Sequence, residues 1–125
     1  MKPNWIKVCQ ADDILPYSGA TVLVMGRQIA IFRVLSDFYA ISDYDPFSGA
    51  YVLSRGIVGD RGGVIKVASP IYKQSFSLMT GECLDDPSVR LPTYPVRVAD
   101  GVIYISIQIQ KQENMYAYDA VSSKG

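Results

Sequence analysis

The chain of 125 residues contains no histidine at all. Without an imidazole it has no histidine general base, no Ser-His-Asp or Cys-His catalytic pair, and no histidine ligand for zinc or haem. Its two cysteines, Cys9 and Cys83, form no CxxC spacing. A disulfide between them would require a fold that brings their Cα atoms within about 7 Å, which the sequence does not show. We interpret them as free thiols in a reducing compartment. These absences exclude most enzyme classes.

The chain also lacks an excess of either charge and lacks long apolar runs. Twelve basic residues balance twelve acidic ones, and charged residues make up 19% of the chain. A general nucleic-acid-binding protein would carry surplus lysine and arginine. No apolar run approaches the roughly 20 residues of a membrane helix, and the first residues lack the apolar core of a signal peptide. We therefore expect a single cytoplasmic domain whose length and 49% hydrophobic content suffice for a core.

The hydrophobic pattern that is present has a period of two almost everywhere. It is clearest near the C-terminal end, where residues 102–110 read Val-Ile-Tyr-Ile-Ser-Ile-Gln-Ile-Gln with isoleucine at every odd position. Alternation of this kind is typical of a strand with one face on a core. The pattern predicts a mostly β protein with strands at 5–10, 21–25, 28–35, 38–41 and 102–110.

The middle of the chain, about residues 42–95, is rich in glycine and proline and predicts a loop-rich subdomain inserted into the β framework. Short strands are expected there at 64–68 and 76–79. Residues 48–54 fit either a short helix or a bent strand, and 57–63 are interpreted as a glycine-rich turn. The organisation expected is one domain over residues 1–110 followed by a C-terminal tail, 111–125.

Two short runs in this middle segment are distinctive together. Residues 45–50 read Asp-Pro-Phe-Ser-Gly-Ala, and residues 69–72 read Ser-Pro-Ile-Tyr, followed at 76–81 by Phe-Ser-Leu-Met-Thr-Gly. They resemble the two cluster-binding loops of Rieske proteins, Cys-Pro-His-x-Gly and Cys-Pro-x-His with a following Phe-x-Leu-x-Thr-Gly strand. The resemblance extends over roughly residues 5–109. It implies a Rieske-like antiparallel β-sandwich or barrel framework.

All four cluster ligands of that family are replaced here. Asp45 and Ser69 stand at the two cysteine positions, and Phe47 and Tyr72 stand at the two histidine positions. A Rieske [2Fe–2S] centre needs two thiolates on one iron and two imidazoles on the other. Phenylalanine has no donor atom, and serine and tyrosine are poor ligands near neutral pH. We therefore expect no iron–sulfur cluster, no other metal and no catalytic residues in this chain.

One cluster-free branch of the family resembles the sequence more closely over the longer runs 53–63, 68–74 and 83–87. These proteins are small subunits of cytoplasmic NAD(P)H-dependent nitrite reductases of nitrate assimilation. The resemblance implies an accessory, non-redox subunit. Its partner would be a large catalytic subunit that carries FAD, siroheme and a [4Fe–4S] cluster and reduces nitrite to ammonium. The alternative is a stand-alone binding module on the same scaffold that regulates another oxidoreductase.

The aromatic residues at the former histidine positions have two interpretations. If Phe47 and Tyr72 face solvent, the old cluster tip becomes a protein-binding surface, with Arg55, Arg61 and Lys73 as further candidates. If the two rings turn inward, they fill the volume that a cluster would occupy. A half-exposed Tyr72 would favour the binding surface.

Overall fold

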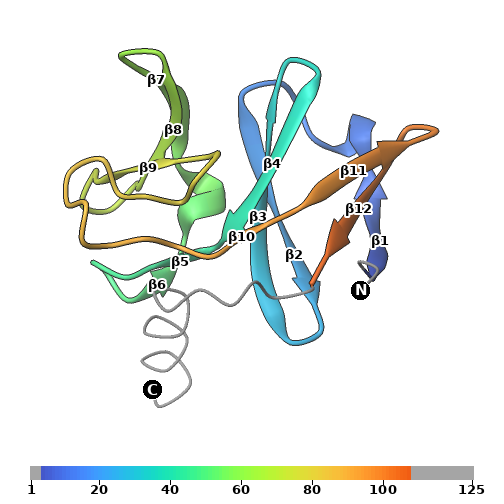
Figure 1. Ribbon diagram of the computed structural model, residues 1–125, viewed down its shortest axis with the longest axis horizontal. Coiled ribbons are helices and arrows are strands. Elements are labelled where there is room, and N and C mark those ends of the chain that lie inside the picture. The colour runs from blue at the N-terminus through green and yellow to red at the C-terminus, as the bar shows by residue number, and fades with distance from the viewer. Residues whose placement is uncertain (1–3, 108–125) are drawn as a thin grey trace.

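The structure, a computed structural model, describes residues 4–107. Its framework consists of two antiparallel sheets (Figure 1). The first has the strand order β1 (Trp5–Gln10), β12 (Val102–Ser106) and β11 (Val96–Ala99). The second has the order β10 (Thr93–Tyr94), β4 (Asp37–Ser42), β3 (Arg27–Val34) and β2 (Ser18–Val24). The mostly β fold class predicted from the alternating pattern is confirmed.

Strand β3 lies at the centre of the molecule and is buried on both faces. Ile29 and Ile31 belong to one apolar cluster, which lies against the β1-β12-β11 sheet through Ile103. Ala30 and Phe32 point the other way, into a second cluster with residues of the middle segment such as Phe76. Burial on both sides explains why this strand reads as a continuous apolar run rather than as an alternation.

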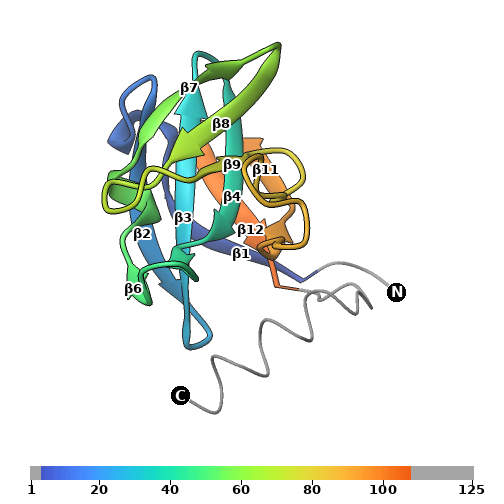
Figure 2. The same cartoon turned by 90° about the vertical axis from the view of Figure 1, so that its left-hand side faces the viewer.

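The middle segment folds over the second face of β3 (Figure 2). It contains a β5–β6 pair and a three-stranded sheet of order β7-β8-β9, and two short 3-10 helices, η1 and η2, complete the fold. Among the described residues no helix is long and apolar enough to cross a membrane. The bounds are β5 (Tyr44–Asp45), β6 (Ala50–Tyr51), β7 (Ile57–Arg61), β8 (Val64–Ala68), β9 (Ser75–Ser77), η1 (Ala11–Asp13) and η2 (Leu53–Arg55).

Two expectations for the middle segment need correction. Residues 57–61 form a strand, β7, and only Gly62 and Gly63 make the turn that was expected over 57–63. The left-handed backbone of both glycines provides a tight two-residue hairpin, so the chain continues to pair up to Arg61. The ambiguous run 48–54 is divided between strand β6 and helix η2. Residues 108–110 of the last expected strand and the tail 111–125 lie outside the described residues.

Four hairpins have two-residue turns, and three of them contain glycine. The turns are Met25–Gly26, Gly62–Gly63 and Asp100–Gly101, all with positive φ at both positions. Such turns match the twist of the strands that they join, and glycine adopts positive φ without steric cost. The β3–β4 turn differs, because Leu35 takes φ = 55° in a Leu-Ser turn without glycine.

Candidate functional site

The two loops that resemble cluster-binding loops have the same backbone hydrogen bonds. In the first, the N–H of Phe47 donates to a carboxylate oxygen of Asp45 (2.9 Å), and the N–H of Gly49 donates to the Asp45 carbonyl (2.7 Å). In the second, the N–H of Ile71 donates to Ser69 Oγ (3.2 Å), and that of Lys73 donates to the Ser69 carbonyl (3.1 Å).

The fifth residue of each loop also has a left-handed backbone. The φ angles are 76° at Gly49 and 71° at Lys73. In both loops a proline follows the first residue and restricts its backbone to extended conformations. The first residue of each loop is thus held with its side chain toward the backbone N–H two residues on. The two loops are equivalent turns, although their side chains differ.

The first residues of the two loops contact each other directly. Ser69 Oγ donates a hydrogen bond of 2.6 Å to Asp45 Oδ2, which also accepts one of 2.9 Å from Ser48 Oγ. Both Asp45 and Ser69 are fully buried. A buried carboxylate without hydrogen bonds would cost several kcal/mol. Together with the Phe47 N–H, the two serine hydroxyls provide three neutral donors from the two loops to the Asp45 carboxylate. The hydrogen bond from Ser69 to Asp45 thus connects the two loops at the place where a cluster would connect them.

The side chains present do not fit a [2Fe–2S] cluster. The carboxylate of Asp45 and the hydroxyl of Ser69 are committed to hydrogen bonds, and Phe47 has no donor atom. A Rieske centre requires two thiolates and two imidazoles, and this set supplies none of them. Among residues 4–107, moreover, no three histidine, cysteine or carboxylate residues gather at one place. The arrangement supports a structural role for the former ligand positions.

The two aromatic residues at the former histidine positions have different environments. Phe47 is half-buried and packs against the core, with its ring 6.1 Å from that of Phe76. Tyr72 is 59% exposed, and its neighbour Ile71 is 45% exposed. One ring therefore fills space inside the domain, and the other projects from the tip. The exposure of Tyr72 favours the binding-surface interpretation for the second loop.

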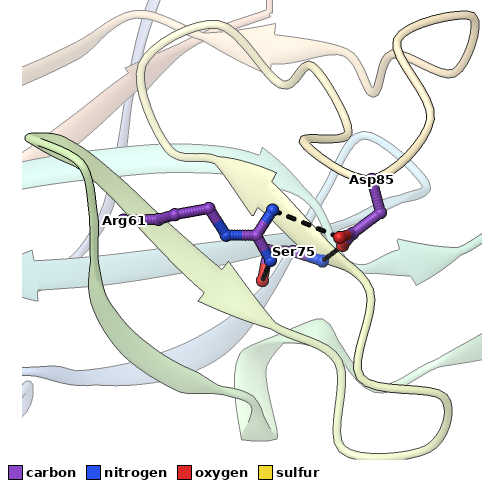
Figure 3. A network of polar contacts seen from close by, with 3 residues as sticks. All are labelled: Arg61, Ser75 and Asp85. Atoms are coloured by element: carbon purple, nitrogen blue, oxygen red, sulfur yellow. Dashed lines mark hydrogen bonds and ion pairs between the residues drawn. The ribbon is translucent and has the colours of Figure 1, made fainter.

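All three basic candidates are exposed, but Lys73 Nζ donates a long hydrogen bond of 3.5 Å to the Pro70 carbonyl, and Arg61 binds side chains of its own domain. The Arg61 guanidinium forms an ion pair of 3.2 Å with Asp85 and donates to Ser75 Oγ (Figure 3). A carboxylate oxygen of Asp85 in turn accepts the Ser75 N–H at 2.8 Å. This network ties β7 and β9 to the loop that follows β9.

The hydrogen bond from the Ser75 N–H, and then the Arg61 side chain, lower the pKa of Asp85. A lowered folded-state pKa gives stability that is present above the unfolded pKa and is lost as the pH falls through the folded value. We expect Asp85→Asn to lower the free energy of unfolding at pH 7 by about 1 kcal/mol or less, because the pair is exposed to solvent.

This loss should shrink as the pH falls through the lowered folded-state pKa of Asp85, because the wild-type carboxylate then becomes protonated as well. Urea unfolding of both proteins from pH 7 down to about pH 2 measures the difference. A difference that stays constant over this range would contradict the assignment to the charge of Asp85. Thr80→Ala, which removes an exposed loop hydroxyl that accepts the Glu82 backbone N–H, is the control without a pH-dependent difference.

A second carboxylate, that of Asp43, is buried and only 1% exposed, whereas its sequence context favours a solvated loop with an Asx turn. It accepts the Ser54 N–H at 2.7 Å and the Thr21 hydroxyl at 3.2 Å, and so joins β2 to η2. An aspartate directly after a buried strand and before a turn is the available signal, but the same pattern occurs in solvated loops. Its partners lie 22 and 11 residues away in the chain, which no local pattern indicates.

The cysteines take no part in this site. Both are free, with Cys9 half-buried and Cys83 buried, and they belong to different apolar clusters. Burial raises the pKa of both thiols, so neither is poised as a thiolate near neutral pH.

Comparison with known proteins supports the resemblance of the loops. Residues 4–106 match the family described as the Rieske-like [2Fe-2S] domain. The chain is 44% identical over 104 residues to the nitrite reductase (NADH) small subunit of Salmonella typhimurium, covering 82% of this chain and 96% of that protein. A crystal structure of a putative NADH-dependent nitrite reductase small subunit from Mycobacterium tuberculosis is 48% identical. It superimposes with a TM-score of 0.81, covering 85% of this chain and 96% of that one.

A further relative carries the same domain inside a longer protein. The nitrite reductase [NAD(P)H] large subunit of Klebsiella oxytoca is 38% identical over 104 residues, which cover 83% of this chain but only 11% of that protein. Matches over nearly the whole described chain, at identities well above 30%, place the sequence in one family. The chain belongs to the Rieske-like [2Fe–2S] domain family and, within it, groups with the nitrite reductase small subunits.

Proposed function

We propose that this chain is an accessory small subunit that binds the large catalytic subunit of an NAD(P)H-dependent nitrite reductase. The observation that carries the proposal is the Klebsiella oxytoca large subunit, in which a domain 38% identical to this chain is covalently joined to a much longer polypeptide. Domains that are fused in one species often bind as separate chains in another. The four side chains at the former ligand positions support a role without redox chemistry in this chain.

The test is association with the large subunit encoded by the same organism. Coexpression with a tag on this chain should yield a stable complex in size-exclusion chromatography, containing the flavin and siroheme of the large subunit. This chain purified alone should contain no stoichiometric iron. Failure to form a complex, combined with capture of another oxidoreductase from native extract, would support the stand-alone regulatory module instead.

We further propose that the tip of the second loop, Ile71, Tyr72 and Lys73, contacts the large subunit, with Arg55 beside it as a candidate. All four side chains are exposed, and an exposed tyrosine beside basic residues has the composition of a binding hot spot. Arg61 is a weaker candidate, because its guanidinium already binds Asp85 and Ser75. Phe47 supports the tip from inside.

Tyr72→Ala is expected to weaken binding of the large subunit about tenfold, a typical effect of truncating an interface aromatic residue. The melting temperature should stay within about 2 °C of wild type, because the ring makes few contacts with its own domain. Isothermal titration calorimetry and a thermal melt measure the two quantities. Leu23→Ala, at a side chain on β2 that is even more exposed than Tyr72, is the control and should bind as wild type. Unchanged affinity of Tyr72→Ala would remove the tip from the interface.

A further inference from the structure

A second exposed apolar surface lies at the other end of β3 and β4 from the two loops. Leu15, Tyr17 and Leu35 are 71%, 51% and 61% exposed there. Strand β4 alone separates the two ends by roughly 20 Å, at about 3.3 Å per residue. Helix η1, the β3–β4 turn and the β11–β12 turn lie on the same side of the framework (Figure 1). We call it the acidic end, after the aspartates described below.

The apolar side chains at the acidic end are held outward by a backbone that costs stability. Tyr17 and Leu35 have φ angles of 60° and 55°, in the left-handed region that disfavours residues with a bulky side chain. Leu35 occupies a hairpin turn position at which glycine or asparagine would relieve the backbone. Neither side chain gains burial in return. Folding of this chain alone gives no reason for a leucine there.

Arg33 fixes the two loops of the acidic end relative to each other. Its Nε donates to the Leu35 carbonyl at 2.7 Å, and one terminal nitrogen donates to the Ile14 carbonyl at 3.0 Å. The Arg33 carbonyl accepts the N–H of Tyr17 at 2.6 Å, and the guanidinium lies 5.5 Å from the ring centre of Phe38. The apolar residues are therefore presented by a preorganised surface, which lowers the entropy cost of binding.

Four exposed aspartates lie on the loops of this end. Asp12 and Asp13 lie in η1, Asp37 follows the β3–β4 turn, and Asp100 lies in the β11–β12 turn; all four are exposed. The N–H of Ala11 donates to the Gly101 carbonyl, which keeps η1 beside the β11–β12 turn. In the segments 11–18, 33–37 and 99–102 the sole basic residue is Arg33, whose guanidinium is occupied. The loops of this end thus carry both exposed apolar side chains and a net negative charge.

We propose that the acidic end is a second contact with the large subunit, formed by an apolar recess bordered by lysine and arginine on that partner. This inference rests on the function proposed above. Exposed apolar side chains near charges of one sign are typical of a protein-binding surface. The sign of these charges selects a basic partner surface, since complementary charges accelerate association and oppose wrong partners. The small subunit then contacts its partner at both ends.

The β2–β3 turn provides a natural comparison. Met25 is 71% exposed and has φ = 50° at the first position of its turn, so it matches Leu35 in exposure, size and backbone. It is followed by Gly26 and Arg27, and no carboxylate lies in this turn. Nearby negative charge thus distinguishes the Leu35 turn from the Met25 turn, and we expect only the Leu35 turn to bind the large subunit.

Leu35→Asn separates binding from folding. Asparagine tolerates positive φ, so the variant should melt at the wild-type temperature or higher, while its Kd for the large subunit rises at least tenfold. Met25→Asn makes the same change at the matched turn and should bind as wild type. Surface plasmon resonance with immobilised large subunit, at 50 and 300 mM NaCl, gives these affinities and their salt dependence.

The triple variant Asp12→Asn, Asp13→Asn, Asp37→Asn tests the charge. Wild-type affinity should fall severalfold between 50 and 300 mM NaCl, and the triple variant should bind more weakly at low salt with a flatter salt dependence. If wild type binds but Leu35→Asn and the triple variant bind equally well, the acidic end is not a contact, and the proposed function stands. If wild type does not bind the large subunit at all, both proposals fall.

Discussion

Replacing Asp45 with alanine is expected to lower the free energy of unfolding by about 3–5 kcal/mol, or the melting temperature by roughly 10–20 °C. The substitution leaves the Phe47 N–H and the hydroxyls of Ser48 and Ser69 without their acceptor, the first two partly buried and the third fully buried. Each unsatisfied buried donor costs about 1–3 kcal/mol. Because these donors come from both loops, the loss is expected to loosen the two loops together.

Two variants provide the comparison for Asp45→Ala. Asp45→Asn keeps the shape and one acceptor oxygen and should cost clearly less, since the serine hydroxyls can reorient. Ser48→Ala removes a single donor and should cost about 1 kcal/mol. Chemical denaturation monitored by Trp5 fluorescence gives all three values. An alanine variant no less stable than Ser48→Ala would show that the carboxylate is not the element that joins the loops.

The combination Asp45→Cys, Phe47→His, Ser69→Cys and Tyr72→His is expected to bind a [2Fe–2S] cluster. Both loops already have equivalent turns, and the Asp45 and Ser69 side chains are in contact, as two thiolates on one iron would require. The expected result is a change from essentially no bound iron to about two irons per chain, with visible absorbance of a histidine-ligated cluster. Reconstitution with iron and sulfide, followed by iron analysis and electron paramagnetic resonance of the reduced protein, measures it.

The double variant Asp45→Cys and Ser69→Cys, which lacks the histidines, is the control for this experiment. It offers thiolates to one iron only and should not give the spectrum of a mixed-ligand cluster. Circular dichroism shows whether each variant is folded before reconstitution. A quadruple variant that is folded yet holds no iron would mean that the two loops have lost the cluster geometry as well as the ligands.

Much of this architecture could be predicted from the sequence, and the exceptions have physical causes. The hydrophobic pattern, alternating or continuous, located β1, β3 and β4, because one or both faces of these strands are buried. It missed β7, since Ile57 and Arg61 are exposed and the strand carries a glycine, so the segment resembles a turn. Periodicity follows burial, and a strand at the edge of a small sheet buries little.

The candidate site was predictable in position but not in its interactions. The loop motifs indicated which residues replace the ligands. They left open whether Phe47 and Tyr72 turn inward, and the answer differs between the two residues because Phe76 offers a partner to one of them. The bond between Asp45 and Ser69 joins residues 24 apart and follows from tertiary packing alone. The acidic end likewise assembles from three separate segments.

Because β3 supplies side chains to both apolar clusters, neither half of the molecule has an independent interior. Excision of the segment between β4 and β10 would expose Phe32 and Ala30 to water, and β3 would lose the packing partners on one of its two faces. Denaturation should therefore proceed in a single cooperative step. Amide protons of β3 should exchange with deuterium only through global opening, at a rate common to the residues on both of its faces.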